Sequence, residues 1–321
     1  MKALFVLAAA LPAAMLSAGA SLAQQYPSKP VTFILPVPPG GALEIFARPM
    51  VQSFAQRTGG QIIIENRPGA DFVIATEACA KAKPDGYTMC MVLRDSISIT
   101  PLLRKVPYDP DKGLVPVTNM VYIQNVLVAH PSVPVKSFRE LVEYSKKNPT
   151  LLNYSAFGSS QMLMEWVKRE SGLQAQFIRY KGQGDAIKDF LGGRLHLNYP
   201  AIGNTGVVAD VNSGKITGLL VAGSNRMPQI PNVPSFTEVG LPNFDARSWL
   251  GLFMPAGVPR EAVSRMSAEV TAIVRNQEFI DKYLTPGGYL PIGGTPEEFA
   301  AFLREDRKVG EQFAKLAPRP K

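Results

Sequence analysis

The sequence contains few of the residues on which enzyme and metal sites are usually built. It has two cysteines and two histidines, and the histidines, His130 and His196, stand in separate segments without a partner at catalytic or metal-ligand spacing. The sequence also lacks a nucleotide-binding glycine loop, an HExxH pattern and a GxSxG pattern. We therefore predict that the protein is not an enzyme and that it has no catalytic residues, no metal and no cofactor.

Blocks of like charge are missing as well. The chain has 34 Lys and Arg residues against 26 Asp and Glu residues, a net charge of +8, and the basic residues are spread along the sequence. This distribution argues against nucleic acid as a partner, because nucleic-acid sites gather basic residues on one face. The positive charge is compatible with an anionic ligand or with an ordinary solvated surface, and composition leaves both interpretations open.

Only one long apolar run is present, and it lies at the N-terminus. The basic Lys2 precedes apolar and small residues up to Leu16, and small residues continue to Ala23. This order is typical of a cleaved signal peptide, here residues 1–23, and the run is shorter than the roughly 20 apolar residues of a membrane span. We predict cleavage near Ala23 and a periplasmic mature protein without a lipid anchor, because no cysteine stands beside the cleavage site.

The two cysteines, Cys79 and Cys90, allow one disulfide. An oxidising compartment favours pairing, and the predicted elements place Cys79 near the end of a helix and Cys90 in the following strand. Adjacent elements can bring two Cα atoms within the short distance that a disulfide requires. Two buried free thiols between a helix and the sheet are the alternative, and both stay open.

The chain after residue 24 alternates strands and helices. Apolar strands are predicted at 31–35, 61–65 and 88–93, with a helix ending before Gly59 and another over 70–82. Strands that are apolar throughout are buried on both faces, as in a parallel sheet covered by helices.

A second α/β unit follows residue 110. It is predicted to begin with a strand over 122–129 and to continue through four helices and four short strands to about residue 216. One more apolar segment, at 251–254, precedes three helices that we expect to return to the first unit. Two cores suit a chain of this length.

The turn after the first strand is rich in proline and glycine. It covers Pro36 to Gly41 and leads into a helix in which Pro49 predicts a kink or a late start. In open α/β sheets, ligands bind at the carboxyl ends of the strands, where glycines and helix N-termini offer backbone amides and a positive dipole end. The turn therefore suits an anion such as a carboxylate, unless it is only a rigid turn chosen for packing.

Short motifs in a fixed order carry a family resemblance along nearly the whole chain after residue 24. They are Tyr26-Pro27-Ser28-Lys29-Pro30, Pro36 to Gly41, Glu65-Asn66-Arg67-Pro68-Gly69-Ala70, Ala82-Lys83-Pro84-Asp85-Gly86-Tyr87-Thr88, Pro107-Tyr108-Asp109-Pro110, Asn153-Tyr154, Tyr180-Lys181-Gly182, Leu191-Gly192-Gly193, Pro231-Asn232-Val233-Pro234 and Ser248-Trp249-Leu250-Gly251. With these motifs the chain resembles the Bug family, the extracytoplasmic receptors of tripartite tricarboxylate transporters.

The resemblance implies a periplasmic-binding-protein-like α/β fold, in which two doubly wound lobes joined by crossover strands close around one ligand. With the predicted elements, lobe 1 is expected at 24–124 plus 250–321 and lobe 2 at 125–249. The implied function is that of a periplasmic solute-binding protein. It would capture a small organic carboxylate, act as a monomer, and deliver the ligand to the membrane components of a tripartite tricarboxylate transporter.

The resemblance also implies one ligand loop in each lobe, with the carboxylate held largely by backbone amides and small hydroxyls. Carried over to this sequence, the loops are Val37 to Leu43 and Ser155 to Ser160. The expected ligand-binding residues are Val37, Pro38, Gly40, Gly41, Ala42, Leu43, Arg94, Ser155, Ala156, Phe157, Gly158, Ser159, Ser160 and Tyr199.

Several positions depart from the family pattern. Glu44 stands where the family usually has Asp, and Arg94 with Asp95 replaces small residues after the third strand. Arg94 could bind a ligand carboxylate through two parallel hydrogen bonds, or it could pair with Asp95 or another acid of the protein. Pro200 stands where the family has an acid, which makes an amino acid ligand less expected.

Phe157 and Tyr199 are expected to line an apolar pocket between two polar ends. Such a pocket would suit a dicarboxylate or an aromatic carboxylate. Two other functions stay open at this point: a sensory receptor that docks on a membrane kinase, and an exported enzyme that acts on carboxylates.

Overall fold

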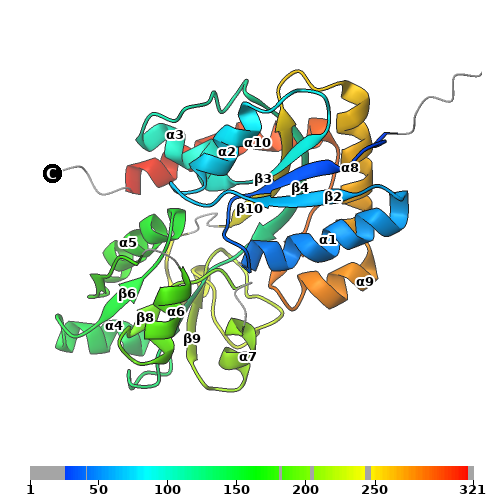
Figure 1. The fold of residues 1–321 in the computed structure, drawn as a ribbon. Helices are drawn as coiled ribbons and strands as arrows, with labels where there is room; N and C mark the ends of the chain where they lie inside the picture. Colours follow the sequence, from blue (N-terminus) through cyan, green and yellow to red (C-terminus); the bar gives the residue numbers. More distant parts are fainter. Residues whose placement is uncertain (1–25, 41, 181–182, 203–205, 243–246, 317–321) are drawn as a thin grey trace, which may run out of the picture.

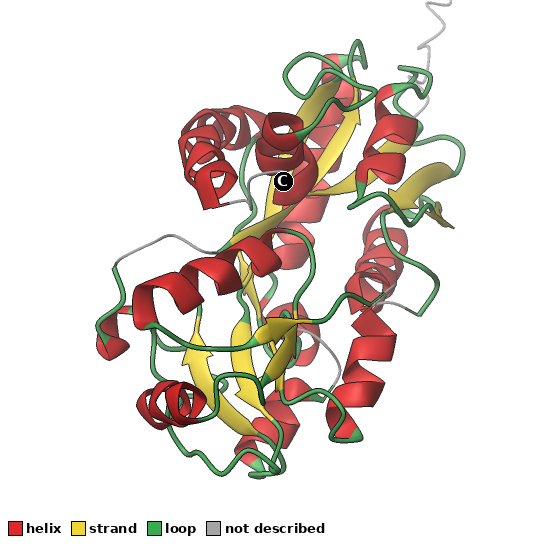
Figure 2. Cartoon of the chain, turned by 90° about the vertical axis from the view of Figure 1, so that its left-hand side faces the viewer, coloured by secondary structure: helices red, strands yellow, loops and turns green. Residues whose placement is uncertain are grey.

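The computed structural model shows two β-sheets, each covered by helices, in two lobes (Figure 1). It describes residues 26–40, 42–180, 183–202, 206–242 and 247–316. The predicted signal peptide and Gly41 lie outside the described residues. The two sheets lie one above the other when the molecule is turned by 90° (Figure 2). This arrangement confirms the predicted α/β fold with two lobes.

The first sheet has six strands in the order β11-β4-β10-β3-β1-β2. Their bounds are β1 Val31–Leu35, β2 Ile62–Asn66, β3 Thr88–Leu93, β4 Leu114–Ile123, β10 Ser248–Pro255 and β11 Tyr289–Pro291. β1 is parallel to β2 and β3, whereas β10 is antiparallel to β3 and β4. The carboxyl ends of β1, β2 and β3 therefore share one edge of the sheet.

Helices cover both faces of the first sheet. Their bounds are α1 Ala42–Thr58, α2 Val73–Ala80, α3 Thr100–Leu103, α8 Arg260–Val274, α9 Gln277–Phe279 and α10 Pro296–Leu316, with π-helical turns η1 Asp95–Ile99 and η3 Ile280–Leu284. Phe33 packs on the α1–α8 side and Ile34 on the α2–α10 side, which is why β1 is apolar throughout. The predicted late start of the first helix is wrong, because α1 begins at Ala42 and includes Pro49.

The second sheet has five strands in the order β7-β6-β8-β5-β9. Its elements are β5 Val126–Ala129, α4 Phe138–Lys147, β6 Asn153–Ser155, α5 Ser159–Ser171, β7 Gln176–Phe177, α6 Gln183–Leu191, β8 Leu197–Asn198, α7 Val207–Asn212, β9 Thr217–Val221 and the 3-10 turn η2 Thr237–Val239. α4 and α5 pack on one face, and α6 and α7 contribute to the cluster on the other. β6 is parallel to β7 and β8.

The chain passes between the two sheets at two places that lie side by side. The first crossing is between the end of β4 and the start of β5, and the second lies between β9 and β10. The two crossings meet where Ser248, at the start of β10, pairs with Ile123, at the end of β4. The first crossing is also bonded to the end of β9: the side-chain amide of Gln124 donates to the carbonyl oxygen of Ala222 at 3.0 Å, and the Ala222 amide donates to the carbonyl oxygen of Asn125 at 2.9 Å. The prediction of one strand over 122–129 is wrong, because the polar pair Gln124-Asn125 separates strands of different sheets.

Sequence reasoning missed most of β4 and all of β11. β4 contains Pro116 and the buried polar residues Thr118 and Asn119, so it lacks the apolar run that marks β1 and β3. The Thr118 hydroxyl is satisfied by Thr271 on α8, at 3.1 Å, and by the carbonyl oxygen of Gly294, at 3.0 Å. These partners are distant in the sequence, and no local sequence pattern predicts them.

The last helix reaches both lobes. Phe299, near the start of α10, packs in the first lobe on the α2 side of the sheet, whereas Val309 and Phe313 pack in the second lobe beside α5. The C-terminal helices α8 and α10 therefore pack on the first sheet, and α10 also contacts α5 of the second lobe. Among the described residues, no helix combines the length and apolar character needed to cross a membrane.

Cys79 at the end of α2 and Cys90 in β3 are bonded as a disulfide, with their Cα atoms 6.0 Å apart. Both residues are fully buried. The bond closes a short chain segment and ties α2 to the sheet that it covers. Of the two alternatives left open by the sequence, the structure has the bridge.

We expect the double variant Cys79→Ala/Cys90→Ala to unfold with a free energy about 2–3 kcal/mol lower than that of the wild type, because the bridge restricts the unfolded chain. Denaturant titration without reductant measures the difference. Dithiothreitol should lower the stability of the wild type and leave that of the variant unchanged. Equal stability of the two proteins in the absence of reductant would contradict this role.

Candidate functional site

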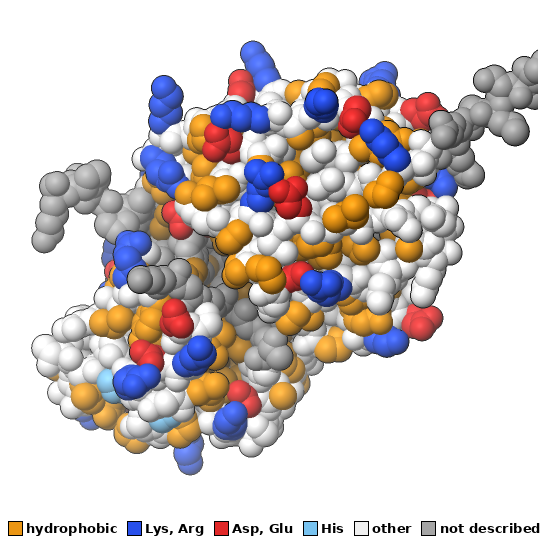
Figure 3. Space-filling model, viewed as in Figure 1, with side chains coloured by type: hydrophobic (Ala, Val, Ile, Leu, Met, Phe, Trp, Pro, Cys, Tyr) orange, Lys and Arg blue, Asp and Glu red, His pale blue; other side chains and the backbone are white. Residues whose placement is uncertain are grey.

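The two predicted ligand loops follow strands at the carboxyl edge of their sheets. The first loop follows β1 and leads into α1, and the second follows β6 and leads into α5. The residues after β3 lie at the same edge as the first loop, because β3 is the parallel neighbour of β1. The molecular surface is hollowed between the two lobes (Figure 3).

The first loop is held by side chains of its own lobe. The buried carboxylate of Glu44 accepts a hydrogen bond from the amide of Gly40, whose φ of +79° requires glycine, and pairs with Arg48 one turn further along α1. The side-chain amide of Asn66 donates to the carbonyl oxygen of Val37 at 2.9 Å. One amide of the predicted cradle is thus occupied by the protein itself. The first amides of α1 have no partner within the helix, and a helix N-terminus of this kind favours an anion.

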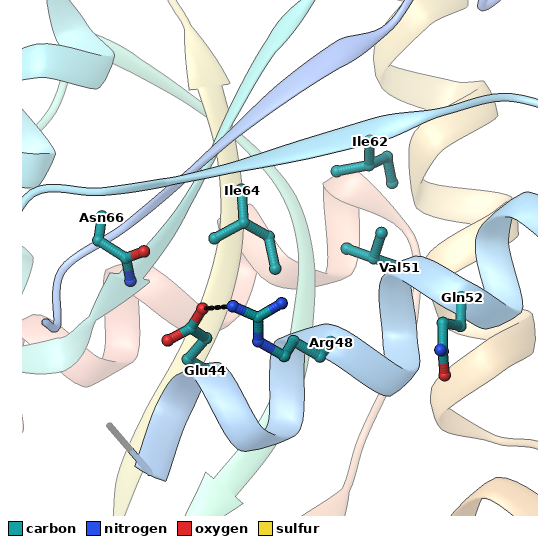
Figure 4. A pocket seen from close by; sticks show the side chains of 7 residues that line it. All are labelled: Glu44, Arg48, Val51, Gln52, Ile62, Ile64 and Asn66. Carbon is teal, nitrogen blue, oxygen red and sulfur yellow. Dashed lines mark hydrogen bonds and ion pairs between the residues drawn. The ribbon is translucent and has the colours of Figure 1, made fainter. Parts of the chain in front are cut away.

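An open pocket of about 330 Å³ lies on the flank of the first lobe (Figure 4). It lies between α1 and β2 and is lined by Glu44, Arg48, Val51, Gln52, Ile62, Ile64 and Asn66. No residue of the second lobe lines it. The pocket therefore does not unite the two predicted loops, although Glu44 and Asn66 connect it to the first of them.

The second loop forms a compact turn at the start of α5. The Ser160 hydroxyl accepts a hydrogen bond from the Phe157 amide at 3.0 Å and donates to the Phe157 carbonyl oxygen at 2.6 Å. Gly158 has a φ of +55° and lies at the helix N-cap without a side-chain cap. The hydroxyl of Ser160 is used within the turn, and the amide of Ser159 points out of it.

The Ser159 amide binds a carboxylate of the opposite lobe. It donates to Oδ1 of Asp95, the first residue of η1, at 2.6 Å. A side chain on Gly158 would place its Cβ 2.7 Å from the same oxygen, so only glycine permits this approach. Burial raises the pKa of Asp95, against the opposing effect of the Ser159 hydrogen bonds and of Arg94. The predicted anion cradle of α5 thus holds an acid that sequence reasoning considered only as a partner for Arg94.

Arg94 is buried, with 2% of its surface exposed, and its guanidinium is bound by the protein. Nη2 lies 2.8 Å from Oδ1 of Asp306 on α10, and Nη1 donates to the carbonyl oxygen of Arg247 at 2.8 Å. The guanidinium also lies over the ring of Phe313, 4.9 Å from its centroid. Of the two alternatives for Arg94, the structure shows an ion pair with a protein acid, and that acid is Asp306.

Asp306 joins three elements of the first lobe to α10. In addition to Arg94, its carboxylate accepts hydrogen bonds from the Ser98 hydroxyl of η1 at 2.6 Å and from the Trp249 indole of β10 at 2.9 Å. Only 4% of Asp306 is exposed. Its position in a polar C-terminal helix gave no signal of this role in the sequence.

Two buried hydroxyl groups at the carboxyl edge of the second sheet have no hydrogen-bond partner among the described residues. They belong to Ser155, at the end of β6, and to Tyr199, just after β8. The Tyr199 ring lies on the face covered by α5, and burial raises the pKa of its hydroxyl. Phe157 packs in the cluster on the other face, so the two rings expected to line one pocket lie in different clusters.

Phe72 is a further residue of this region that sequence reasoning missed. Its φ of +71° is unusual for an aromatic residue, and it follows two other non-glycine residues with positive φ, Ala70 and Asp71. The Phe72 ring reaches the second loop, where it would lie 3.8 Å from a Cβ on Gly158. The preceding Gly69 marks a turn in the sequence but does not predict this contact.

The two histidines lie at the opposite edge of the second sheet from the second loop. His196 precedes β8 and His130 follows the antiparallel β5, and the His130 amide donates to the His196 carbonyl oxygen at 2.9 Å. The His196 ring bonds Asn153 at 2.8 Å, and burial, followed by the nearby His130, lowers the pKa of His196. Within the described part of the chain, no group of three His, Cys, Asp or Glu residues could hold a metal ion.

Comparisons with known proteins agree with this architecture. The sequence model of a family described as the tripartite tricarboxylate transporter family receptor matches residues 46–315. The solved periplasmic binding protein BugD is 27% identical, with a TM-score of 0.81 over 91% of this chain and 98% of its own. An R. palustris protein solved with adipate has 27% identity and a TM-score of 0.83 over 91% and 98%. MatC of Rhodopseudomonas palustris, with bound malate, has 28% identity and a TM-score of 0.78 over 90% and 100%.

The family match covers most of the chain, and the chain belongs to the receptor family of tripartite tricarboxylate transporters. The resemblance to the Bug family, predicted from short motifs, is confirmed.

We expect Asp306→Asn to lower the free energy of unfolding by about 3–5 kcal/mol, because it leaves the Arg94 guanidinium buried without its counter-charge. Asp111→Asn is the matched control, since Asp111 pairs with Arg307, the next residue of α10, at the surface. Asp111→Asn should lower the free energy of unfolding by only about 0–1 kcal/mol. Denaturant unfolding compares the two variants. Similar losses in both would contradict a central role for Asp306.

The raised pKa of Asp95 predicts a pH-dependent cost. The folded state holds the proton of this carboxyl more tightly than the unfolded chain, so stability falls as the pH rises from the ordinary Asp value, about 4, through the raised pKa. Asp95→Asn removes this cost, and its melting temperature relative to the wild type should increase between about pH 4 and pH 7. Thermal melts over this range, with Asp85→Asn as a control for the lost charge, measure the trend. If the melting temperature of Asp95→Asn relative to that of the wild type instead decreases as the pH rises, the Ser159 amide lowers the pKa of Asp95 more than burial raises it.

Proposed function

We propose that this chain is a periplasmic solute-binding protein, released by cleavage near Ala23, that binds one small organic carboxylate between its lobes as a monomer. It delivers the ligand to the membrane components of a tripartite tricarboxylate transporter. The observation that carries this proposal is the bond across the lobes, in which the Ser159 amide of α5 binds the Asp95 carboxylate at 2.6 Å. It supports the proposal because a helix N-terminus at the place where the lobes meet binds a carboxylate group, which is the interaction proposed for the ligand at the first loop.

The solved relatives support the same chemical class. The R. palustris protein was solved with adipate and MatC with malate, and both ligands are carboxylates. In this chain the first amides of α1 are the part of the first loop suited to a ligand carboxylate, because the helix N-terminus offers N–H groups and a positive dipole end. The sequence predicts a dicarboxylate or an aromatic carboxylate.

Binding is proposed to proceed by closure of the lobes, with limits at 24–124 plus 250–321 and at 125–249. A ligand that touches both lobes binds the closed form more tightly than the open form and shifts the equilibrium by that difference. The hinge is proposed to lie at the two chain crossings, at Gln124 and Asn125 and at the start of β10, where Ser248 pairs with Ile123.

The two alternative functions have little support. The histidines lie at the sheet edge opposite the second loop, and the acids nearest the predicted loops, Glu44 and Asp95, are bound by backbone amides. This arrangement does not favour a general acid or base in contact with a solute. No observation on the described residues points to a kinase rather than to a transporter.

A thermal-shift screen of the ligand-stripped mature protein against small organic carboxylates tests the proposal. A carboxylate at 100 times its Kd should stabilise the fold by about 2.7 kcal/mol and raise the melting temperature by roughly 5 °C. The neutral methyl ester of the same compound should produce no shift. The carboxylate should be recovered unchanged, and its turnover would favour the enzyme alternative. A folded protein that no carboxylate stabilises would overturn the proposal.

The variant Ala42→Pro tests the first loop. It removes one backbone N–H at the first position of α1, where a helix tolerates proline. We expect the affinity for the carboxylate found in the screen to fall at least about tenfold, because a hydrogen bond to a charged group is lost. Gln277→Pro, at the first position of α9, is the control and should bind normally. Isothermal titration calorimetry measures both, and unchanged affinity of Ala42→Pro would exclude this amide as a ligand contact.

A further inference from the structure

Asp95 occupies the N-terminus of α5 from the opposite lobe. It follows β3 of the first sheet, is 5% exposed, and accepts the Ser159 amide hydrogen bond across 64 residues of sequence. Its backbone belongs to η1, which packs on α10, and α10 also packs on α5. η1, which carries the carboxylate, and α5, which carries the amide, thus both pack on α10.

This carboxylate is not a local helix cap. The turn before α5 already has its own side-chain contact, between Ser160 and Phe157. The guanidinium of the adjacent Arg94 pairs with another acid, Asp306. Asp95 therefore brings a negative charge to a position where the positive end of a helix dipole would otherwise meet an anion.

Besides Arg94, which pairs with Asp306, the second sheet contributes uncharged polar residues at the edge from which α5 starts. Ser155 ends β6 and Tyr199 follows β8, at the strand ends from which α5 starts, and their hydroxyls, which belong to residues that are at least nine-tenths buried, have no partner among the described residues. Tyr199 is on the sheet face that α5 covers. A hydroxyl can donate or accept a hydrogen bond, so this part of the site can bind a neutral polar group.

We propose that Asp95 is a specificity-determining residue that excludes a carboxylate from the α5 side of the site. The preferred solute then has one carboxylate, bound at the first loop, and a neutral hydrogen-bond donor such as a primary amide or a hydroxyl at the other end. This inference rests on the proposed function and refines it. Two carboxylates at one buried position repel each other, whereas a donor group can bind the remaining lone pairs of Asp95.

Matched pairs of diacids and their monoamides test the inference by isothermal titration calorimetry. The pairs are succinate and succinamate, glutarate and glutaramate, adipate and adipamate, and terephthalate and 4-carbamoylbenzoate. Wild-type protein should bind the monoamide of at least one pair at least about tenfold more tightly than the diacid. Asp95→Ala should reverse this order by freeing the Ser159 amide for the second carboxylate.

Two controls separate the role of Asp95 from loss of charge or of structure. Asp85→Asn removes the same charge from the turn before β3, at the opposite end of the strand, and should keep the wild-type preference. Asp95→Asn keeps the shape of the side chain in case Asp95→Ala does not fold, and it should weaken the preference for the monoamide at least about tenfold.

The outcomes distinguish this inference from the proposed function. If wild-type protein binds a diacid as tightly as its monoamide, or if the Asp95 variants keep the wild-type ratio, the inference is wrong and carboxylate binding stands. If neither the wild type nor Asp95→Ala binds any compound of the four pairs, and no carboxylate of the thermal-shift screen stabilises the folded protein, the proposed function fails, and the inference fails with it.

Discussion

The buried ion pair between Arg94 and Asp306 is the interaction on which the arrangement of the site depends. Asp306 binds Arg94 from the end of β3, Ser98 from η1 and Trp249 from β10, and so fixes α10 against the segment 94–98 and against β10, which is distant from that segment in the sequence. A buried pair of this kind adds little net stability compared with apolar packing, but breaking it is costly. Its effect is to define one position for η1, and η1 carries Asp95.

Both predicted ligand loops hold a carboxylate of the protein, but the two acids differ in kind. Glu44 lies in the first turn of α1, next to the loop that it binds, and its charge is balanced by Arg48. Asp95 comes from the other lobe and reaches α5 only because the tertiary structure brings β3 beside it. Glu44 stabilises the loop that precedes its own helix, whereas Asp95 changes the groups that the opposite lobe offers to a solute.

Local patterns in the sequence predicted the parts of the fold that depend on local forces. β1 and β3 are apolar throughout because both faces of their sheet are covered, and the turn at 36–40 is marked by its prolines and glycine. β4 was missed because its polar residues are satisfied by distant partners such as Thr271. The roles of Arg94 and Asp95 could not be read from their neighbours either. Their partners, Asp306 and Ser159, are 212 and 64 positions away, and only the fold brings them together.

The way in which α10 spans both lobes has a mechanical consequence. Phe313 is 1% exposed in the core of the second lobe, so withdrawing it would expose a large apolar ring to water. In the proposed closure about the chain crossings, Phe313 has to stay in place, so α10 restricts how far the elements that it contacts can separate. Asp95 and Ser159 belong to η1 and α5, which both contact α10, so the proposed closure would keep the carboxylate beside the start of α5 in the open form as well as in the closed form. A solute would then meet this charge when it enters the site, before the lobes have closed.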